Sequence, residues 1–473
     1  MALSEYVIIN KSALESNLRK KDWSVVCELL RISITTFNTV KNERVLTPDD
    51  AETLGRVLRE AVLHAGEDPS AVLPAATECL RLLRNGCANA PGFQAAVRAP
   101  CLEATRGLLA RLAEREDHQP AVLCLRTGLQ FLGNAVVGCV ENQVLVWRDF
   151  SGMLINFLEF HDEKVVNFAA MVIYNILLGC PNAMSGIETH GIELFESLIG
   201  HAMKDSEFAL FTLELFLRRE GFLPDVYGRL GAEHRLFLLA AAHGMLGEGR
   251  GGPPTRSVAF LAGRLKQGAD DILGTCEERS VDRPEPREVA GLLELVASAS
   301  GQSPYLEHLQ QDTSLLVDCL FLLRSMHGLG RSGDNCFAPV RKLSELTVSS
   351  RSADVEEHPA FGFKAGLVRL LANLCWRNRA NQDRVRELDG IPLLLDCCNI
   401  DARNPLIIQW AVLAVRNLCE GNAENQAVIA GMNRQGVVDG AVLREAGLTL
   451  HQGGGDGKIT VIPHELARAS EPV

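Results

Sequence analysis

The stretch LLANLCWRNRANQDRVRELDGIPLLLDC at residues 370–397 decides the fold of this chain. It begins as an apolar helical face that carries one asparagine, Asn373, breaks at the polar pair Asn381-Gln382, and resumes as a second apolar run. Inside a helix, asparagine costs roughly 0.6 kcal/mol relative to alanine. An asparagine in so apolar a helix therefore needs a structural or functional cause.

The same order of residues returns along the chain. The stretch WAVLAVRNLCEGNAENQAVI (410–429) places an asparagine ahead of an Asn-Gln pair, and LQFLGNAVVGCVENQVLV (129–146) does the same. With two weaker copies included, the recurring asparagines are Asn85, Asn134, Asn175, Asn373 and Asn417. Apart from one long gap they are spaced by about 40–50 residues, and such a period is typical of armadillo and HEAT repeats. We therefore predict an all-α fold, an armadillo/HEAT-like α-solenoid of stacked helical repeats.

The repeats divide the chain into five segments. Armadillo-like repeats are predicted at 1–180 and again at 362–446, and helical apolar spacing without a readable register fills 181–347. The polar, acidic segment 348–361 is predicted to be a flexible loop. The tail, 447–473, alternates apolar and polar residues on both sides of a Gly-rich turn, which predicts a short C-terminal β-hairpin.

Composition restricts the class of protein. Of the 473 residues 47% are hydrophobic but only 5% are aromatic, so the core is built from aliphatic side chains that suit helix packing. The net charge of −12 argues against nucleic acid as a general partner. We find no secretory signal, and the longest apolar run, 168–180, is shorter than the ~20 residues that span a bilayer. We expect a cytoplasmic protein without membrane insertion, whose 14 cysteines are reduced.

The motifs of catalysis are missing or out of context. The dinucleotide pattern G-x-G-x-x-G occurs at Gly328, Gly330 and Gly333, but a Leu-rich helical run precedes it where a strand is required, so we expect a flexible loop there. Neither H-E-x-x-H nor G-x-S-x-G is present. We predict no catalytic residue, no cofactor and no metal, and a protein that is not an enzyme. A single sequence leaves an unfamiliar catalytic site open.

The five asparagines allow two interpretations. In the structural one, each amide bonds to backbone of the adjacent repeat and satisfies polar groups that the stacking buries. In the functional one, the amides form a ladder along the concave face and hold the backbone of an extended peptide. Both remain open from the sequence.

A basic, aromatic segment accompanies the third strong copy. Arg369, Trp376, Arg377 and Arg379 are candidate partner-binding residues, because arginine forks and an indole plane can anchor an acidic peptide. The alternative is a solvated face offset by nearby carboxylates. The phosphorylation candidates, which also arise by chance, are Thr47, Ser303, Ser349, Ser350 and Ser352.

Three stretches together resemble the ataxin-10 family. They are CLRLLRNGCAN, LQFLGNAVVGCVENQ and the long segment 362–429, where the match is closest. The resemblance implies an armadillo-type, cytoplasmic (perinuclear) protein without enzymatic activity. It implies roles in neuronal survival, neurite outgrowth and cytokinesis, at the centrosome, ciliary basal body and midbody. The implied partners are an O-linked N-acetylglucosamine transferase, a heterotrimeric G-protein β subunit and, as a homo-oligomer, the chain itself.

The leading functional interpretation is a protein-interaction scaffold or adaptor. One alternative is a regulatory activator subunit of a partner enzyme such as a protein glycosyltransferase. A nuclear-import-type receptor fits less well, because import armadillo proteins carry a tryptophan four residues before each ladder asparagine. Those positions hold Arg81, Gln130, Met171, Arg369 and Leu413 here.

Overall fold

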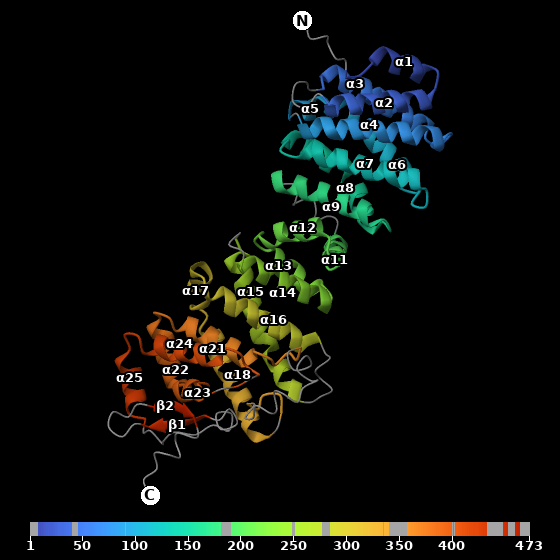
Figure 1. The fold of residues 1–473 in the computed structure, drawn as a ribbon. Helices are drawn as coiled ribbons and strands as arrows, with labels where there is room; N and C mark the ends of the chain where they lie inside the picture. Colours follow the sequence, from blue (N-terminus) through green and yellow to red (C-terminus); the bar gives the residue numbers. More distant parts are fainter. Residues whose placement is uncertain are drawn as a thin grey trace. The chain divides into compact units, whose positions relative to one another are not determined.

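The described part of this computed structural model is almost entirely helical (Figure 1). It comprises residues 8–39, 46–89, 91–180, 191–247, 251–276, 284–333, 335–339, 357–399, 401, 403–432, 448–452 and 459–463. The chain divides into two compact units, Met1–Phe216 and Leu217–Val473. Of the predicted loop 348–361, residues 348–356 lie outside the described ranges.

In the N-terminal unit the helices stack in chain order from α1 to α12 (Figure 1). α2 packs on α4, α4 on α7 and α7 on α9, while α3 packs on α6 in a second layer. The helices are α1 (Lys11–Arg19), α2 (Trp23–Thr39), α3 (Pro48–His64), α4 (Pro69–Asn89), α5 (Pro91–Ala96), α6 (Arg98–Leu112), α7 (Gln119–Val136), α8 (Val140–Asn156), a 3-10 turn at Phe157–Glu159, α9 (Glu163–Gly179), α11 (Gly191–Ala202) and α12 (Glu207–Leu217).

The C-terminal unit repeats this stacking. α14 packs on α16, α16 on α21 and α21 on α24. Its elements are α13 (Phe222–Val226), a 3-10 turn at Tyr227–Arg229, α14 (Ala232–Gly247), α15 (Thr255–Gly268), a 3-10 segment at Ala269–Cys276, α16 (Pro284–Ala299), α17 (Ser303–Leu309), α18 (Thr313–Ser332), α21 (Phe363–Leu374), α22 (Arg379–Glu387), α23 (Gly390–Asp396), α24 (Ile407–Cys419), α25 (Ala423–Ala430), β1 (Leu448–Gln452) and β2 (Ile459–Pro463). The stacked helices confirm the predicted α-solenoid.

The predicted C-terminal hairpin is also confirmed. β1 pairs antiparallel with β2, in a register that places Leu448 opposite Pro463 and Gln452 opposite Ile459. The Gly-rich stretch between the strands is where the alternating pattern placed the turn.

Several helices begin at side chains that cap them. Asn378 and Asn422 accept the backbone N–H three residues ahead, at the starts of α22 and α25. Such caps contribute about 1 kcal/mol each because they satisfy N–H groups that the first turn leaves unpaired. In both repeats the capping asparagine lies three residues before the Asn-Gln pair, so the pair itself has a different role.

The glycine pattern at 328–333 belongs to a helix, and the predicted loop is wrong there. α18 continues to Ser332 and contains Gly328 and Gly330. A Cβ at Gly330 would lie 2.3 Å from the backbone oxygen of Phe337, so the close approach of the backbone just after α18 requires glycine. The glycine therefore allows a close backbone contact and does not form a ligand-binding loop.

The core consists mainly of Leu, Val, Ile and Ala, as the composition indicates. α21, for example, is covered by α16, α18 and α24. It therefore buries apolar side chains around most of its circumference, namely Leu367, Val368, Leu370, Leu371 and Leu374. Burial of each such side chain contributes about 1.5–3 kcal/mol. All cysteines are free thiols, and burial raises the pKa of the Cys375 thiol to about 12.

Candidate functional site

The recurring asparagines lie near the ends of the helices α4, α7, α9, α21 and α24, which we call the ladder helices. Three of the five make the same bond, in which Nδ2 donates to the backbone carbonyl of the residue just before the preceding recurring asparagine. These bonds join Asn134 to Arg84 at 3.0 Å, Asn175 to Gly133 at 3.4 Å and Asn417 to Ala372 at 2.8 Å. Each bond fastens one ladder helix to the next.

The other two asparagines bond differently. Asn373 Nδ2 donates to Ser300 Oγ at 2.9 Å, beyond the end of α16. Asn85 Oδ1 accepts two bonds from the guanidinium of Arg84, at 3.1 and 3.0 Å. The bonds of Asn134, Asn175 and Asn417 agree with the structural interpretation, whereas Asn373 and Asn85 bond to side chains. An amide carries two N–H donors and an acceptor, which is more than the bonds described here use. Binding of an extended peptide along these residues stays a prediction.

The glutamines form a second series of inter-repeat bonds. In each, Nε2 donates to the carbonyl of the next recurring asparagine. The pairs are Gln94 with Asn134 at 2.7 Å, Gln143 with Asn175 at 3.1 Å, Gln310 with Asn373 at 3.4 Å and Gln382 with Asn417 at 2.8 Å. The Asn-Gln pattern in the sequence does not identify Gln94 and Gln310, because neither follows an asparagine.

The Asn-Gln pairs also close their own repeat. Each amide donates to the carbonyl seven residues earlier, at the end of the ladder helix that precedes it. For the asparagines these bonds run from Asn142 to Ala135 at 2.8 Å, from Asn381 to Leu374 at 2.9 Å and from Asn425 to Leu418 at 2.8 Å. The pair therefore satisfies carbonyls at helix C-termini, which the helix itself leaves without partners.

The basic helix α22 is largely paired inside the protein. Arg379 donates to Asp383 at 3.1 Å and to the Gly421 carbonyl at 3.0 Å, and forms an ion pair with Glu424. Burial raises the pKa of Asp383, but hydrogen bonds from arginines and from Asn422 outweigh it and hold this pKa at about 2. Arg379 therefore joins α22 to the following repeat.

Arg369 lies in a polar cluster between ladder-layer helices. Its guanidinium carbon is 5.0 Å from the centroid of the Trp410 ring, and its NH1 donates to Ser298 Oγ at 3.3 Å. His243 Nε2 is 2.9 Å from the same Oγ. Burial lowers the pKa of Arg369, although a guanidinium remains charged in proteins.

Trp376 and Arg377 occupy the turn after α21, and we call this pair the Trp376–Arg377 site. Trp376 is 43% exposed, and the guanidinium carbon of Arg377 lies 4.9 Å from the centroid of its ring. Arg377 forms no ion pair with any described residue. Of the four predicted partner-binding residues outside the ladder, Trp376, Arg377 and Arg379 are exposed, and Arg379 is already paired with carboxylates.

The backbone of Arg377 is left-handed, with φ of 51°. The corresponding residues of two other repeats, four positions after Asn134 and Asn417, are Gly138 and Gly421, with φ of 67° and 66°. A side chain in this conformation costs roughly 1–2 kcal/mol. Strain of this kind concentrates at functional sites.

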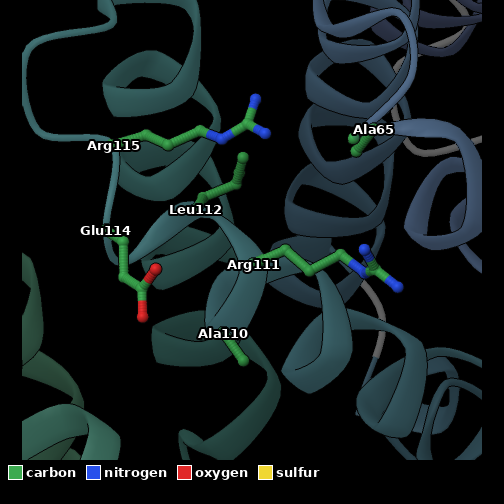
Figure 2. Close-up of a pocket in the computed structure, with 7 residues that line it drawn as sticks. Ala65, Ala110, Arg111, Leu112, Glu114 and Arg115 are labelled. Atoms are coloured by element: carbon green, nitrogen blue, oxygen red, sulfur yellow. The ribbon is translucent and has the colours of Figure 1, made fainter.

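A small hollow lies elsewhere, in the N-terminal unit (Figure 2). Figure 2 shows Arg111 and Arg115 at the end of α6 and Ala65 on the opposite wall. Its volume of about 230 Å³ is below the roughly 300 Å³ at which ligand pockets begin. It contains none of the residues predicted from the sequence.

Two of the phosphorylation candidates are described. Thr47 is exposed and caps α3 in a reciprocal arrangement with Asp50, and Ser303 is exposed as the first residue of α17. Ser349, Ser350 and Ser352 lie outside the described residues. Within the described ranges we find no group of three or more potential metal ligands. No described helix is both long and apolar enough to cross a membrane.

Stacked helices whose ends are joined by side-chain amides define an armadillo-type helical repeat protein. The family model for the spinocerebellar ataxia type 10 protein domain matches residues 363–462. Ataxin-10 of Xenopus tropicalis is 33% identical over 419 residues, which cover 85% of this chain and 83% of that protein. Human Ataxin-10 is 29% identical over 451 residues, with 90% and 92% covered. The chain therefore belongs to the ataxin-10 family.

The similarity to more distant relatives is local. The Ataxin-10 homolog of Dictyostelium discoideum is 48% identical over 87 residues, 18% of this chain and 14% of that protein. Among solved structures, the crystal structure of an engineered protein covers 87% of this chain and 99% of its own with a TM-score of 0.37 and 16% identity. Family membership supports a non-enzymatic, helical scaffold-type protein.

Proposed function

We propose that this chain is an adaptor that binds partner proteins through the Trp376–Arg377 site. The observation that carries the proposal is the left-handed backbone of Arg377, at a position where two other repeats have glycine. Glycine would adopt this conformation without strain. An arginine at this position, stacked on an exposed tryptophan, is suited to contact with a partner.

The partner segment we propose is acidic. A guanidinium donates two parallel hydrogen bonds to a carboxylate, and no described carboxylate pairs with Arg377. Stacking against Trp376 limits the freedom of the guanidinium, so less entropy is lost on binding. Tryptophan and arginine are also the residues that most often dominate interface energies.

The identity of the partners follows from the family and is likewise proposed. We propose an O-linked N-acetylglucosamine transferase and a heterotrimeric G-protein β subunit as partners, together with self-association. The proposed roles are support of neuronal survival and neurite outgrowth and a part in cytokinesis. The proposed places are the perinuclear cytoplasm, the centrosome or ciliary basal body, and the midbody.

The test compares two exposed arginines near each other in the chain. Purified transferase and purified G-protein β subunit are titrated against wild type, against Trp376→Ala with Arg377→Gly, and against Arg384→Ala as the control. Arg384 is exposed and paired with Glu387, so the control removes one positive charge without touching the site. We expect the double variant to lose about tenfold or more in affinity, which is 1.4 kcal/mol, and the control to keep wild-type affinity.

Circular dichroism checks that all three proteins are folded. When the double variant is folded by this measure, its loss of binding is attributed to the site and not to unfolding. Equal affinities for all three proteins would exclude the site. An activator subunit is the alternative function, and a rise in the turnover of the purified transferase on addition of this chain distinguishes it from a passive scaffold.

A further inference from the structure

Among the described residues, the last repeat of the C-terminal unit presents a face that its predecessor buries. Val368 of α21 is 0% exposed, and Gln382 of α22 is 2% exposed. The corresponding residues one repeat later are Val412 of α24, which is 59% exposed, and Gln426 of α25, which is also exposed. We call Val412, Val415, Cys419, Gln426 and Ile429 the end face.

The chain itself shows what covers such a face. α24 and the turn after it lie on α21 and α22. Asn417 Nδ2 donates to the Ala372 carbonyl, and Gln382 Nε2 donates back to the Asn417 carbonyl at 2.8 Å and the Glu420 carbonyl at 3.4 Å. The covering element is therefore a helix, fastened through its C-terminal end.

The same pattern occurs earlier in the chain. In two further repeats the covered glutamine donates to the carbonyl of a recurring asparagine and to that of the residue three positions later. Gln94 donates to the carbonyls of Asn134 and Val137. Gln310 donates to the carbonyls of Asn373 and Trp376. A helix end brings carbonyls three residues apart together, whereas in a strand they lie about 10 Å apart and point to opposite sides. These glutamines are suited to a helix end.

Gln426 makes the bond within its own repeat but, among the described residues, none to a following helix. Its Nε2 donates to the Cys419 carbonyl at 2.8 Å, the bond that Gln382 makes to Cys375. Within the described residues no carbonyl of a following helix accepts its second N–H.

We propose that the end face binds one amphipathic α-helix of a partner protein, in the place that a further ladder helix would occupy. The helix needs an apolar stripe over Val412, a side-chain amide that reaches the Arg416 carbonyl, and free C-terminal carbonyls for Gln426. This continues the interface between α21 and α24 by one more layer. The end face shares no residue with the Trp376–Arg377 site, and each proposal is tested with its own variants.

The probe is a peptide with the sequence of α24, the helix that covers the corresponding face of α21. A fluorescein-labelled peptide of residues 405–421, with Cys419→Ser, reproduces α24 and its turn, and fluorescence anisotropy follows its binding to the intact chain. We expect saturable one-to-one binding. Val412→Glu in the intact chain, with the peptide unchanged, should weaken this binding about tenfold or more. The control is Leu63→Glu in the N-terminal unit, an aliphatic residue with 61% exposure, which should leave binding unchanged.

A second peptide tests the register. Asn417→Ala in the peptide removes the amide for the Arg416 carbonyl and should weaken binding several-fold. Absence of saturable binding, or equal binding by the Val412→Glu variant, would overturn the proposal. So would sedimentation of the intact chain as an oligomer that Val412→Glu dissociates, because the occupant would then be a second copy.

Discussion

Replacement of one buried glutamine tests how the repeats are held together. Gln382 is 2% exposed, and its amide makes three bonds of 3.2 Å or less, to the Cys375 carbonyl, to the Asn417 carbonyl and from Asn422 Nδ2. Gln382→Met keeps the volume and removes all three. At about 1 kcal/mol of net stability per bond, the loss is about 3 kcal/mol.

The matched control is the same residue type at the same repeat position. Gln426 is exposed and makes a single bond, to the Cys419 carbonyl, which water can replace. Gln426→Met should therefore cost less than about 1 kcal/mol. The difference between the two variants reports the inter-repeat bonds alone.

Hydrogen exchange measured by mass spectrometry is the appropriate assay, because a chain with two compact units need not unfold in a single step. A loss of 3 kcal/mol raises exchange through local opening about a hundredfold. We expect this rise in peptides from α21 to α25 of Gln382→Met, and almost none in Gln426→Met. Similar rises in both variants would refute the reasoning.

Three further predictions concern the same repeats. Arg377→Gly should stabilise the protein by up to about 1 kcal/mol in thermal unfolding, since strain of roughly 1–2 kcal/mol is relieved and the flexibility of glycine offsets part of it; a lower melting temperature would contradict the strain argument. The pKa of Asp383 is lowered from 3.8 to about 2 in the folded state, so its contribution to stability is complete above pH 4 and is lost as the pH falls toward 2; Asp383→Asn should flatten this part of the stability profile in urea titrations, and an unchanged slope would refute it. Val368→Ala should cost about 2 kcal/mol in urea unfolding because it leaves a cavity, whereas Val412→Ala should cost little; equal costs would show that the end face is covered.

The repeat architecture could be predicted because the sequence carries it locally. An asparagine near the end of an apolar helix, followed by an Asn-Gln pair, is legible in three copies, and the alternation around the Gly-rich turn indicated the hairpin. These signals use residues close together in the chain, where helix and strand periodicity act.

The roles of individual side chains could not be predicted in the same way. Arg379 looked accessible in the sequence, but its partner Glu424 lies in the following repeat. Gln94 and Gln310 have no asparagine before them, and no sequence pattern shows that Gly330 meets the backbone of Phe337. The strain at Arg377 could be found from sequence only by aligning it with Gly138 and Gly421, once the register is known.

The central claim, that an acidic partner binds the Trp376–Arg377 site, is tested most directly by mapping the bound surface. Hydrogen exchange of this chain is compared with and without the purified transferase or G-protein β subunit at saturating concentration. We expect protection at residues 374–378 in the wild type and none there in the Trp376→Ala, Arg377→Gly variant. Protection confined to other segments, with 374–378 exchanging as in the free chain, would contradict it.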